Sequence, residues 1–458
     1  MEVANAPDDA VVPALQSIAA KVGATWDSDA PVQVVVGRDT RPSSTELAAL
    51  LCRGVEMAGG TVLDLGIVTT PQTHHVVLMA NRAGAQYPGL DGYVRMLSDA
   101  YQALTKGAAP LEGPLAVDCA HGVGACVVPQ LNAVLPSDAQ LAPFNEPDAS
   151  APERLNHGCG AEFVQKQRKP PAGVPDSAKA GRVCSLDGDA DRVVYYFWTP
   201  EGKWTLLDGD AIAVLAAVFV QRQLADLGWT AVGLDDAADA PNAVRVGMVQ
   251  TAYANGASTK YVRDELKLPV AVAKTGVKHV HHKATAFDLG IYFEANGHGT
   301  VLFKPELIAR LQAVTSDASA TAGQQQAAQR LLLASQLINQ AVGDALSDAL
   351  FCEAALRVLG WNLADWSKLY ADLPSAQNKA PVPNRAAYIT NEDETRLLEP
   401  LTLQAAIDDI VSRTPGARAF VRPSGTEDVV RLYAEAPTEE AAAEVAAAVF
   451  AAIADSAA

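Results

Sequence analysis

Three aspartates occupy alternate positions of one short segment: Asp187, Asp189 and Asp191, followed directly by Arg192. Carboxylates spaced in this way on a glycine-bearing turn can converge on one hard divalent cation. An EF-hand loop is excluded, because its sixth position here is Arg192 instead of glycine and its twelfth is Trp198 instead of glutamate. The pattern predicts Mg²⁺ shared with a phosphate, with the arginine stabilising phosphoryl oxygens. The alternative is a solvated acidic turn between two strands.

A second polar loop combines a guanidinium, two hydroxyls and an uncovered backbone. Its residues are Arg422, Ser424, Gly425 and Thr426, with Arg431 a little further on. These are the parts of a phosphate cradle, although proline, serine and glycine are also common in ordinary hairpin loops. The added arginine favours the phosphate interpretation.

A third loop, which follows the apolar run LGIYF, contains Glu294, Asn296 and His298. Carboxylate and amide groups on such a loop can hydrogen-bond sugar hydroxyls or an amide, and the alternative is a polar turn with a solvated histidine. Upstream, five basic or imidazole side chains crowd between Lys278 and Lys283. That stretch favours an anionic ligand, although two of its histidines could be packed structural residues. A zinc site is not expected, since no cysteine or glutamate at ligand spacing completes one.

Strand and helix patterns alternate along the chain. We expect strands at 32–37, 61–65, 115–119, 182–186, 192–197, 418–421 and 429–434, and helices at 43–59 and 438–457. Alternation of this kind predicts α/β layers with parallel sheets. The proline-bearing stretch 373–384 resembles an interdomain linker, and we place domain boundaries near residues 110, 240 and 375.

The composition fits a globular protein of three or four domains, with 458 residues of which 49% are hydrophobic and 19% charged. The formal net charge of −18 excludes a broad basic surface for nucleic acid or an anionic membrane. Six cysteines form no CxxC pair, and the first residues show no signal-peptide pattern, so we expect a cytoplasmic protein. No P-loop motif occurs, and residues 122–124 give only half of a dinucleotide fingerprint.

Taken in order, these loops resemble those of the α-D-phosphohexomutase superfamily. Their sequences are most similar to those of its phosphoacetylglucosamine mutase branch. The segments that carry the resemblance are VGRDTRPSS (36–44), TTPQTHH (69–75), DCAHGVGA (118–125), VQTAYANGAST (249–259), KTGVKHVHHKA (274–284), FEANGHGTVLF (293–303) and INQAVGDALSD (338–348). In most of the superfamily the sugar loop reads E-x-S-G-H. The asparagine at position 296 is what the acetylglucosamine branch shows.

The resemblance implies three mixed α/β domains (1–110, 111–240 and 241–375) and a smaller C-terminal α+β domain (376–458). It also implies a role for each loop. Asp187, Asp189 and Asp191 would bind Mg²⁺, and Arg192 would lie beside the transferring phosphoryl group. Glu294 and Asn296 would contact sugar hydroxyls, with His298 supporting their loop. The non-reacting phosphate would be held by Arg422, Ser424, Gly425 and Thr426, with Lys278 and Arg431 as further contacts.

One part of the family pattern has no counterpart in this sequence. Family members carry a phosphoserine in a loop close to T-A-S-H-N-P, before the region that matches 32–44, and no such motif occurs here. Ser43 and Ser44 follow a proline at a helix start, where an N-cap role explains them better. We therefore expect that the chain begins partway through the first domain, which would leave a sheet edge exposed.

Three functional hypotheses follow, in order of preference. The first is a mutase that interconverts N-acetylglucosamine 6-phosphate and 1-phosphate through a 1,6-bisphosphate. The second is a non-catalytic phosphosugar-binding protein, and the third is a phosphoglucomutase or phosphomannomutase, which Asn296 and the stretch 274–282 argue against. In each, the partner is a small phosphosugar, and no nucleic acid, membrane or obligate protein partner is implied.

Overall fold

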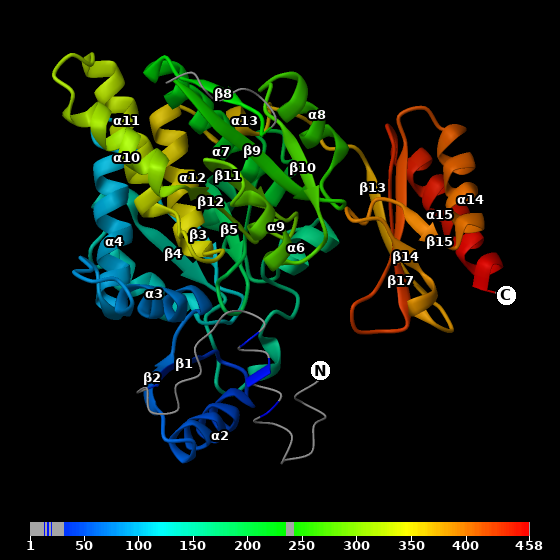
Figure 1. Cartoon of the computed structure of the whole chain (residues 1–458), viewed down its shortest axis with the longest axis horizontal. Helices are drawn as coiled ribbons and strands as arrows, with labels where there is room; N and C mark the ends of the chain where they lie inside the picture. Colours follow the sequence, from blue (N-terminus) through cyan, green and yellow to red (C-terminus); the bar gives the residue numbers. More distant parts are fainter. Residues whose placement is uncertain (1–12, 14–15, 18–19, 21–31, 235–241, 458) are drawn as a thin grey trace.

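A computed structural model describes residues 13, 16, 17, 20, 32–234 and 242–457. Three α/β regions form a main body, and a smaller C-terminal sheet with two helices stands beside it (Figure 1). The first region begins with a parallel pair, β1 (Gln33–Arg38) and β2 (Thr61–Ile67), connected by α2 (Ser44–Met57). The helices α3 (Thr70–Ala80) and α4 (Gly89–Leu104) then lead into the main body. The strands and helix expected from the sequence here are confirmed to within about two residues.

The expected capping role of the serines before α2 is wrong in detail. Ser43 occupies the N-cap position, but its side chain makes no capping hydrogen bond. Ser44 lies inside the helix, and its hydroxyl donates to the carbonyls of Asp39 and Arg41, each at 2.8 Å. The backbone of the turn at 39–44 therefore provides the hydrogen-bond acceptors for the Ser44 hydroxyl. None of the α2 side chains is buried, and Leu47 and Leu51 are more than half exposed.

The second sheet holds the acidic segment. Its strands lie in the spatial order β4 (Leu141–Phe144), β3 (Leu115–Asp118), β5 (Arg182–Leu186), β6 (Val193–Trp198) and β7 (Trp204–Leu207). The first three are parallel, as the strand and helix alternation predicted, whereas β5, β6 and β7 are antiparallel neighbours that this alternation did not indicate, so the sheet is mixed. The reason is local: a six-residue turn suffices to join β5 to β6 as a hairpin, and a parallel connection needs a much longer crossover. Helices α5 (Gly124–Asn132) and α6 (Ala161–Gln167) belong to this region.

The third sheet is also mixed. The strand β9 (Ala243–Thr251) pairs in parallel with β8 (Thr230–Val232), β10 (Val270–Ala273) and β11 (Leu289–Phe293), while β12 (Gly299–Phe303) runs antiparallel to β11. Its helices are α7 (Gly209–Leu227), α8 (Gly256–Asp264), α9 (Val277–Ala284), α10 (Pro305–Ser316), α11 (Ala322–Leu337), α12 (Ala345–Leu359) and α13 (Leu363–Trp366). The hairpin between β11 and β12 carries the predicted sugar loop.

The C-terminal sheet is antiparallel, in the order β13 (Ser375–Pro381), β17 (Val429–Glu435) and β16 (Arg418–Pro423). A short pair, β14 (Ile389–Thr390) with β15 (Leu397–Glu399), lies next to it. One face packs on α14 (Leu401–Ser412) and α15 (Glu439–Ala457). The other, called the polar face below, carries charged residues together with Phe420 and Tyr433, which pack against Ala252 and Tyr253 of the third region. The linker expected at 373–384 is wrong, because most of it forms β13. Only Ala376 and Ala380 of this strand face the helices, which leaves no apolar pattern to detect.

The largest hydrophobic core joins α3 and α4 of the first region to the second and third regions, whereas the C-terminal sheet has a core of its own. The helix α12 lies at the centre of the large core, with 13 of its residues buried, and it packs against α4, α7 and β6. Among residues 32–234 and 242–457, no helix is both long enough and apolar enough to cross a bilayer.

A buried ion pair ties α12 to the second sheet. Arg182 Nε lies 3.0 Å from Glu353 Oε2, and the same guanidinium donates to the carbonyls of Glu112 and Gly113. The two side chains are only 11% and 7% exposed. Removal of either partner leaves a charge in a poorly solvated place.

We therefore expect Glu353→Ala to lower the free energy of unfolding by about 3–5 kcal/mol, the typical effect of breaking a buried pair. Asp408→Asn is the matched control, since its ion pair with Arg396 is about half exposed, and we expect at most about 1 kcal/mol from it. Thermal and urea unfolding of the main transition measure both. Equal effects of the two variants would contradict the assignment.

Candidate active site

The acidic turn between β5 and β6 brings its three carboxylates together. One ligand atom from each of Asp187, Asp189 and Asp191 lies within 4.8 Å of the others. Asp187 Oδ1 accepts hydrogen bonds from the backbone N–H groups of Asp191, at 3.0 Å, and Arg192, at 3.2 Å. Ala190 has a positive φ of 57°, which folds the turn back so that these amides point at the carboxylate. The local sequence thus builds a pocket of oxygen ligands at the end of a buried hairpin.

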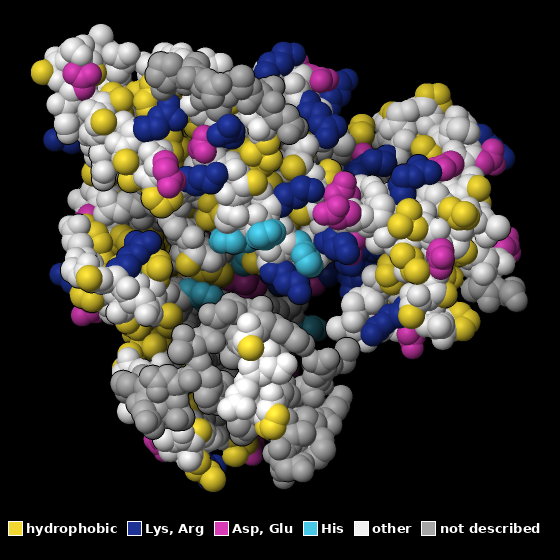
Figure 2. Space-filling model, viewed as in Figure 1, with side chains coloured by type: hydrophobic (Ala, Val, Ile, Leu, Met, Phe, Trp, Pro, Cys, Tyr) yellow, Lys and Arg dark blue, Asp and Glu magenta, His cyan; other side chains and the backbone are white. Residues whose placement is uncertain are grey.

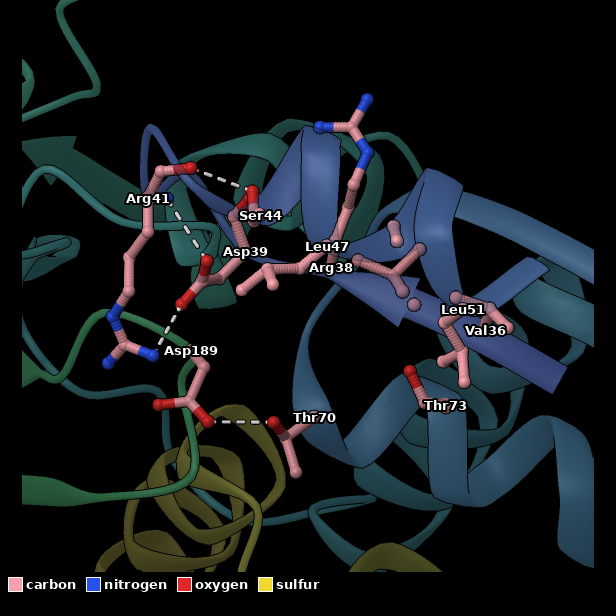
Figure 3. Close-up of a pocket in the computed structure, with 13 residues that line it drawn as sticks. Val36, Arg38, Asp39, Arg41, Ser44, Leu47, Leu51, Thr70, Thr73 and Asp189 are labelled. Carbon is pink, nitrogen blue, oxygen red and sulfur yellow. Dashed lines mark hydrogen bonds and ion pairs between the residues drawn. The ribbon is translucent and has the colours of Figure 1, made fainter. Parts of the chain in front are cut away.

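The other two carboxylates are held by regions far away in the sequence. Asp189 Oδ2 accepts a hydrogen bond from Thr70 Oγ1 at 2.7 Å, and Thr70 N donates to the carbonyl of Asp189 (Figure 3). Asp191 Oδ2 lies 3.2 Å from Nδ1 of the buried His298. The first, second and third regions therefore all meet at this turn.

The electrostatics of the turn favour a bound cation. Burial raises the pKa of Asp187 well above its usual range, and the charges of Asp191 and Asp189 raise it further. Burial would also raise the pKa of Asp191, but interactions with His298, Asp187 and Arg192 outweigh it, so that pKa is lowered. Asp191 Oδ1 is buried and accepts no hydrogen bond from any described residue. Clustered carboxylates with a buried oxygen that accepts no hydrogen bond fit a hard divalent ion such as Mg²⁺.

Arg192 stands beside this cluster, as predicted. Its Nε lies 3.5 Å from Asp191 Oδ1 and 3.6 Å from Asp187 Oδ2, and Nη1 lies 3.4 Å from Glu162 Oε2. The side chain is about one third exposed, so it is fixed by ion pairs while its outer edge remains accessible. A guanidinium in this position can meet a phosphoryl group placed over the carboxylates.

A cavity of about 350 Å³ adjoins the turn at Asp189 (Figure 3). Its other lining comes from β1, α2 and α3, with Arg38, Asp39 and Arg41 along one side. Arg41 Nη1 pairs with Asp39 Oδ2 at 2.9 Å. The acidic turn therefore borders an open, partly charged space and is not sealed inside the core.

The predicted sugar loop packs directly against the acidic hairpin. Val193 N donates to the carbonyl of Gly297 at 3.1 Å, which joins β6 to the loop. Gly297 has a φ of +89°, and a Cβ there would lie 2.0 Å from the carbonyl of Val193, so only glycine allows this approach. His298 N donates to Asn296 Oδ1 at 3.0 Å, and Glu294 Oε1 accepts from Gly276 N at 3.3 Å. Glu294 and Asn296 are half-buried at the edge of the loop.

The basic stretch that follows Gly276 is less uniform than its sequence suggests. Lys278 is exposed near the start of α9. His281 Nδ1 lies 3.1 Å from Tyr292 Oη, and the pKa of His281 is lowered by burial and by the charges of His282 and His298, so this residue is a packed one. Lys283 Nζ lies 3.4 Å from Asp393 Oδ1 in the C-terminal region. The stretch therefore contributes mainly through Lys278 and through contacts between regions.

The predicted phosphate loop joins β16 to β17. Ser424 is buried, while Gly425 and Thr426 are exposed, and Thr426 N lies 3.5 Å from Ser424 Oγ. Arg422 Nε donates to Tyr253 Oη at 3.1 Å, which links the loop to the third region. No hydrogen bond or ion pair between described residues connects residues 422–431 with the acidic turn at 187–192. The two loops are therefore held in place by different contacts.

The polar face of the C-terminal sheet carries a row of cations that the sequence did not reveal. Arg431 is paired across the sheet with Arg422 on one side and with Lys379 on the other. Directly opposed residues share a face and like charges there are unfavourable, so the row is suited to an anion. Arg431 Nε is buried without a hydrogen-bond partner among the described residues. Lys379 was missed because β13 was taken for a linker.

The same face is anchored to the third region by Arg418. Its two terminal nitrogens donate to the carbonyls of Ala252, at 3.0 Å, and Ala254, at 2.7 Å, and Nε donates to Glu435. Glu435 also accepts from Gly256 N at the start of α8. These contacts position the phosphate loop relative to the main body.

The crowded carboxylates predict that one substitution weakens Mg²⁺ binding and yet stabilises the metal-free protein. Asp187→Asn should lower the affinity for Mg²⁺ at least about tenfold, since one anionic ligand is lost. The same change should raise the melting temperature of the metal-free protein, because it removes a buried charge that its neighbours repel. Calorimetric titration with MgCl₂ and thermal unfolding in EDTA measure the two effects. Asp264→Asn, an exposed change of the same charge, should alter neither.

Comparison with known proteins supports a common family. Models of phosphoacetylglucosamine mutase AMG1 match residues 89–194 (domain II) and 208–361 (domain III). Phosphoglucomutase/phosphomannomutase models match 4–86 (alpha/beta/alpha domain I) and 377–452 (C-terminal domain). The chain is 43% identical to the phosphoacetylglucosamine mutase of Sus scrofa and 41% identical to that of Homo sapiens. Each comparison covers 96% of this chain and 78% of the relative.

Solved structures agree with this result. An Aspergillus fumigatus N-acetylphosphoglucosamine mutase in complex with GlcNAc-6P and magnesium superposes with a TM-score of 0.86 at 38% identity, over 98% of this chain and 87% of that one. A serine-to-alanine variant of the fungal enzyme, in complex with glucose 1,6-bisphosphate, gives 0.88 at 37% identity, over 100% and 82% of the two chains. The predicted fold class, three mixed α/β domains with a smaller C-terminal α+β domain, is confirmed. By its sequence and its fold, this chain belongs to the phosphoacetylglucosamine mutase family of the phosphohexomutases.

Proposed function

We propose that this protein takes part in the interconversion of N-acetylglucosamine 6-phosphate and N-acetylglucosamine 1-phosphate through a 1,6-bisphosphate, with Mg²⁺ as cofactor. A phosphoserine would give its phosphoryl group to the 6-phosphate, and the bisphosphate would then return its other phosphoryl group to that serine. The T-A-S-H-N-P loop that carries this serine in the family does not occur in the sequence, so the described residues supply the metal, sugar and phosphate sites but not the phosphoryl donor. The observation that carries the proposal is the convergence of three chain regions on the Asp187–Asp191 carboxylates, next to Arg192 and the sugar loop. A structural relative contains GlcNAc-6P and magnesium, which supports the same ligands for this chain. The partner is therefore a small phosphosugar, as the sequence predicted.

Each loop has a distinct task in this proposal. Asp187, Asp189 and Asp191 would hold the Mg²⁺, which when bound neutralises charge on the transferring phosphoryl group. Arg192 binds the phosphoryl oxygens from the side of the carboxylates. His298 supports the site indirectly: its ring contacts Asp191, and its backbone N–H donates to Asn296 of the sugar loop.

The substrate is positioned by groups on both sides of the site. Glu294 and Asn296 bind sugar hydroxyls and the acetamido group, and Lys278 adds a cation at the rim. The phosphate that does not react is held on the C-terminal sheet by Arg422, Ser424, Gly425, Thr426 and Arg431. Because this second clamp is remote from the carboxylates, either end of a bisphosphate can occupy it while the other end lies over the metal site.

A second candidate is a phosphosugar-binding protein without turnover. The observation that favours it is the lack of any T-A-S-H-N-P segment in the sequence, the loop that carries the phosphoserine in the family. A serine-to-alanine variant of a relative still holds glucose 1,6-bisphosphate, so binding and turnover are separable. The third hypothesis, a phosphoglucomutase or phosphomannomutase, is less favoured by the asparagine at position 296 and by the relatives that match.

Phosphorus NMR separates these candidates. The protein is incubated with N-acetylglucosamine 6-phosphate, Mg²⁺ and a catalytic amount of glucose 1,6-bisphosphate. Appearance of the 1-phosphate resonance supports the mutase. Calorimetric binding of the 6-phosphate without turnover supports the binding protein, and faster conversion of glucose or mannose 6-phosphate overturns the assigned sugar. Absence of both binding and turnover rejects all three.

The cytoplasm is the compartment we propose. All six cysteines are free, and four of them are buried in the described structure, which suits a reducing environment. Cell fractionation tests this, and recovery of the protein in a secretory or organellar fraction would reject it.

The domain boundaries near 110, 240 and 375 also remain predictions, which limited proteolysis can check.

The phosphate clamp yields a further prediction. Arg422→Gln should weaken binding of the phosphosugar about tenfold or more, because a charge-assisted contact to phosphate is lost. Arg413→Gln removes the same charge from an exposed site directly after α14 and should leave binding within about twofold. Calorimetric titration with N-acetylglucosamine 6-phosphate measures both variants. Equal affinities for the two would exclude Arg422 from the phosphate site.

A further inference from the structure

The turn between β14 and β15 reaches from the C-terminal region to the phosphate loop and to the third region. Its Glu394 has side-chain Oε2 3.0 Å from Thr275 N and 3.6 Å from Arg422 Nη1. The neighbouring Asp393 pairs only with Lys283 among the described residues, at 3.4 Å. One turn thus presents three carboxylates, since Glu392 is exposed beside these two, and among the described residues only that of Glu394 contacts the proposed phosphate clamp.

The carboxylate of Glu394 is held in place by its own turn. Glu394 has a φ of 57°, and its N–H donates to the carbonyl of Asn391 at 3.2 Å. Asn391 Oδ1 accepts from the N–H groups of Thr395 and Arg396, at 2.9 and 3.1 Å. The side chains of Glu394 and Arg422 are only 15% and 13% exposed. This ion pair is therefore better ordered and less screened than a typical surface pair.

Two of the three nitrogens of Arg422 already have partners. Nε donates to Tyr253 Oη at 3.1 Å, and Nη1 lies 3.4 Å from the carbonyl of Pro423 as well as near Glu394, whereas Nη2 makes no hydrogen bond to any described residue. A phosphate that binds through Nη2 lies on the same guanidinium as the carboxylate, so the two anions repel each other, and a phosphate that also uses Nη1 must replace the carboxylate. Figure 2 shows acidic and basic side chains gathered where the main body meets the C-terminal sheet.

We propose that Glu394 competes with the substrate phosphate for Arg422, and that it thereby sets the affinity of the clamp and eases release of the phosphosugar. The inference rests on the proposed phosphate-binding role of Arg422. When phosphate binds, the carboxylate gives up the guanidinium but can keep its hydrogen bond from Thr275 N. When phosphate leaves, the carboxylate restores the ion pair. Glu394 is thus a specificity-determining residue that acts against binding, not a ligand of the substrate.

A purely structural role predicts no gain in phosphate affinity. If Glu394 only fastened its turn to Thr275, Glu394→Gln would leave phosphate binding unchanged while that contact is kept, and would weaken it if the contact is lost. Competition predicts tighter binding after the charge is removed. The sign of the change therefore separates the two roles, and Glu394→Gln is the suitable variant because its amide oxygen can still accept from Thr275 N.

The test is calorimetric titration of the full chain with inorganic phosphate in the presence of Mg²⁺. We expect Glu394→Gln to bind phosphate roughly three- to tenfold more tightly than the parent protein, the range set by loss of one partly buried competing charge. Asp393→Asn is the matched control, because it removes a carboxylate from the same turn that pairs with Lys283 instead. We expect it to change phosphate affinity less than twofold.

A double variant shows whether the effect passes through Arg422. In the Arg422→Gln background, Glu394→Gln should no longer tighten phosphate binding, because the shared partner is gone. Unchanged or weaker binding in the single Glu394→Gln variant, or an equal gain in Asp393→Asn, would overturn the proposal. If Arg422→Gln alone leaves phosphate affinity unchanged, the clamp itself is wrongly assigned and the competition fails with it. Melting temperatures of all variants confirm that they are folded.

Discussion

Repulsion among three carboxylates on one turn is the constraint that organises this molecule. Asp187, Asp189 and Asp191 can approach within 4.8 Å only because each is held by different groups. Backbone amides of the turn hold the first, a threonine from the first region holds the second, and a buried histidine from the third region holds the last. The site is therefore assembled from parts distant in the sequence. The shared core of these three regions follows from the same requirement, since the holding groups must not drift apart.

The C-terminal sheet presents its cations from a separate support, since no hydrogen bond or ion pair between described residues joins residues 422–431 to the carboxylates at 187–191. Alternation along its strands gives it an apolar face against α14 and α15 and a polar face toward the main body. On that face, Arg418 contacts backbone carbonyls, whereas Arg422 pairs with the side chain of Glu394. Under our proposal the first kind of contact sets the position of the sheet, and the second is exchanged when phosphate binds.

Much of this could be predicted from the sequence, because the signals were local. The β5–β6 hairpin flanked a motif whose residue types and spacing defined its chemistry, and Arg192 lies where it was expected. What escaped prediction depended on long-range pairing or on weak patterns. Thr70 contacts Asp189 across 119 residues, and nothing near Thr70 indicates that. Lys379 lies on a strand that buries only small alanines, and Glu394 sits on a turn with no motif. The mixed sheets followed from hairpin connections that periodicity alone does not distinguish from crossovers.

The central position of α12 bears on how the protein is made. This helix ends at Leu359, yet it fills the middle of a core whose other members begin near Met79. A nascent chain leaves the ribosome from its N-terminus, so several strands and helices must wait, partly uncovered, until α12 has been synthesised. During that interval their apolar faces are available to other chains. A protein built in this way depends on rapid synthesis of its central segment or on chaperones that cover the unfinished core, whereas its last eighty residues can close around their own core as soon as they emerge.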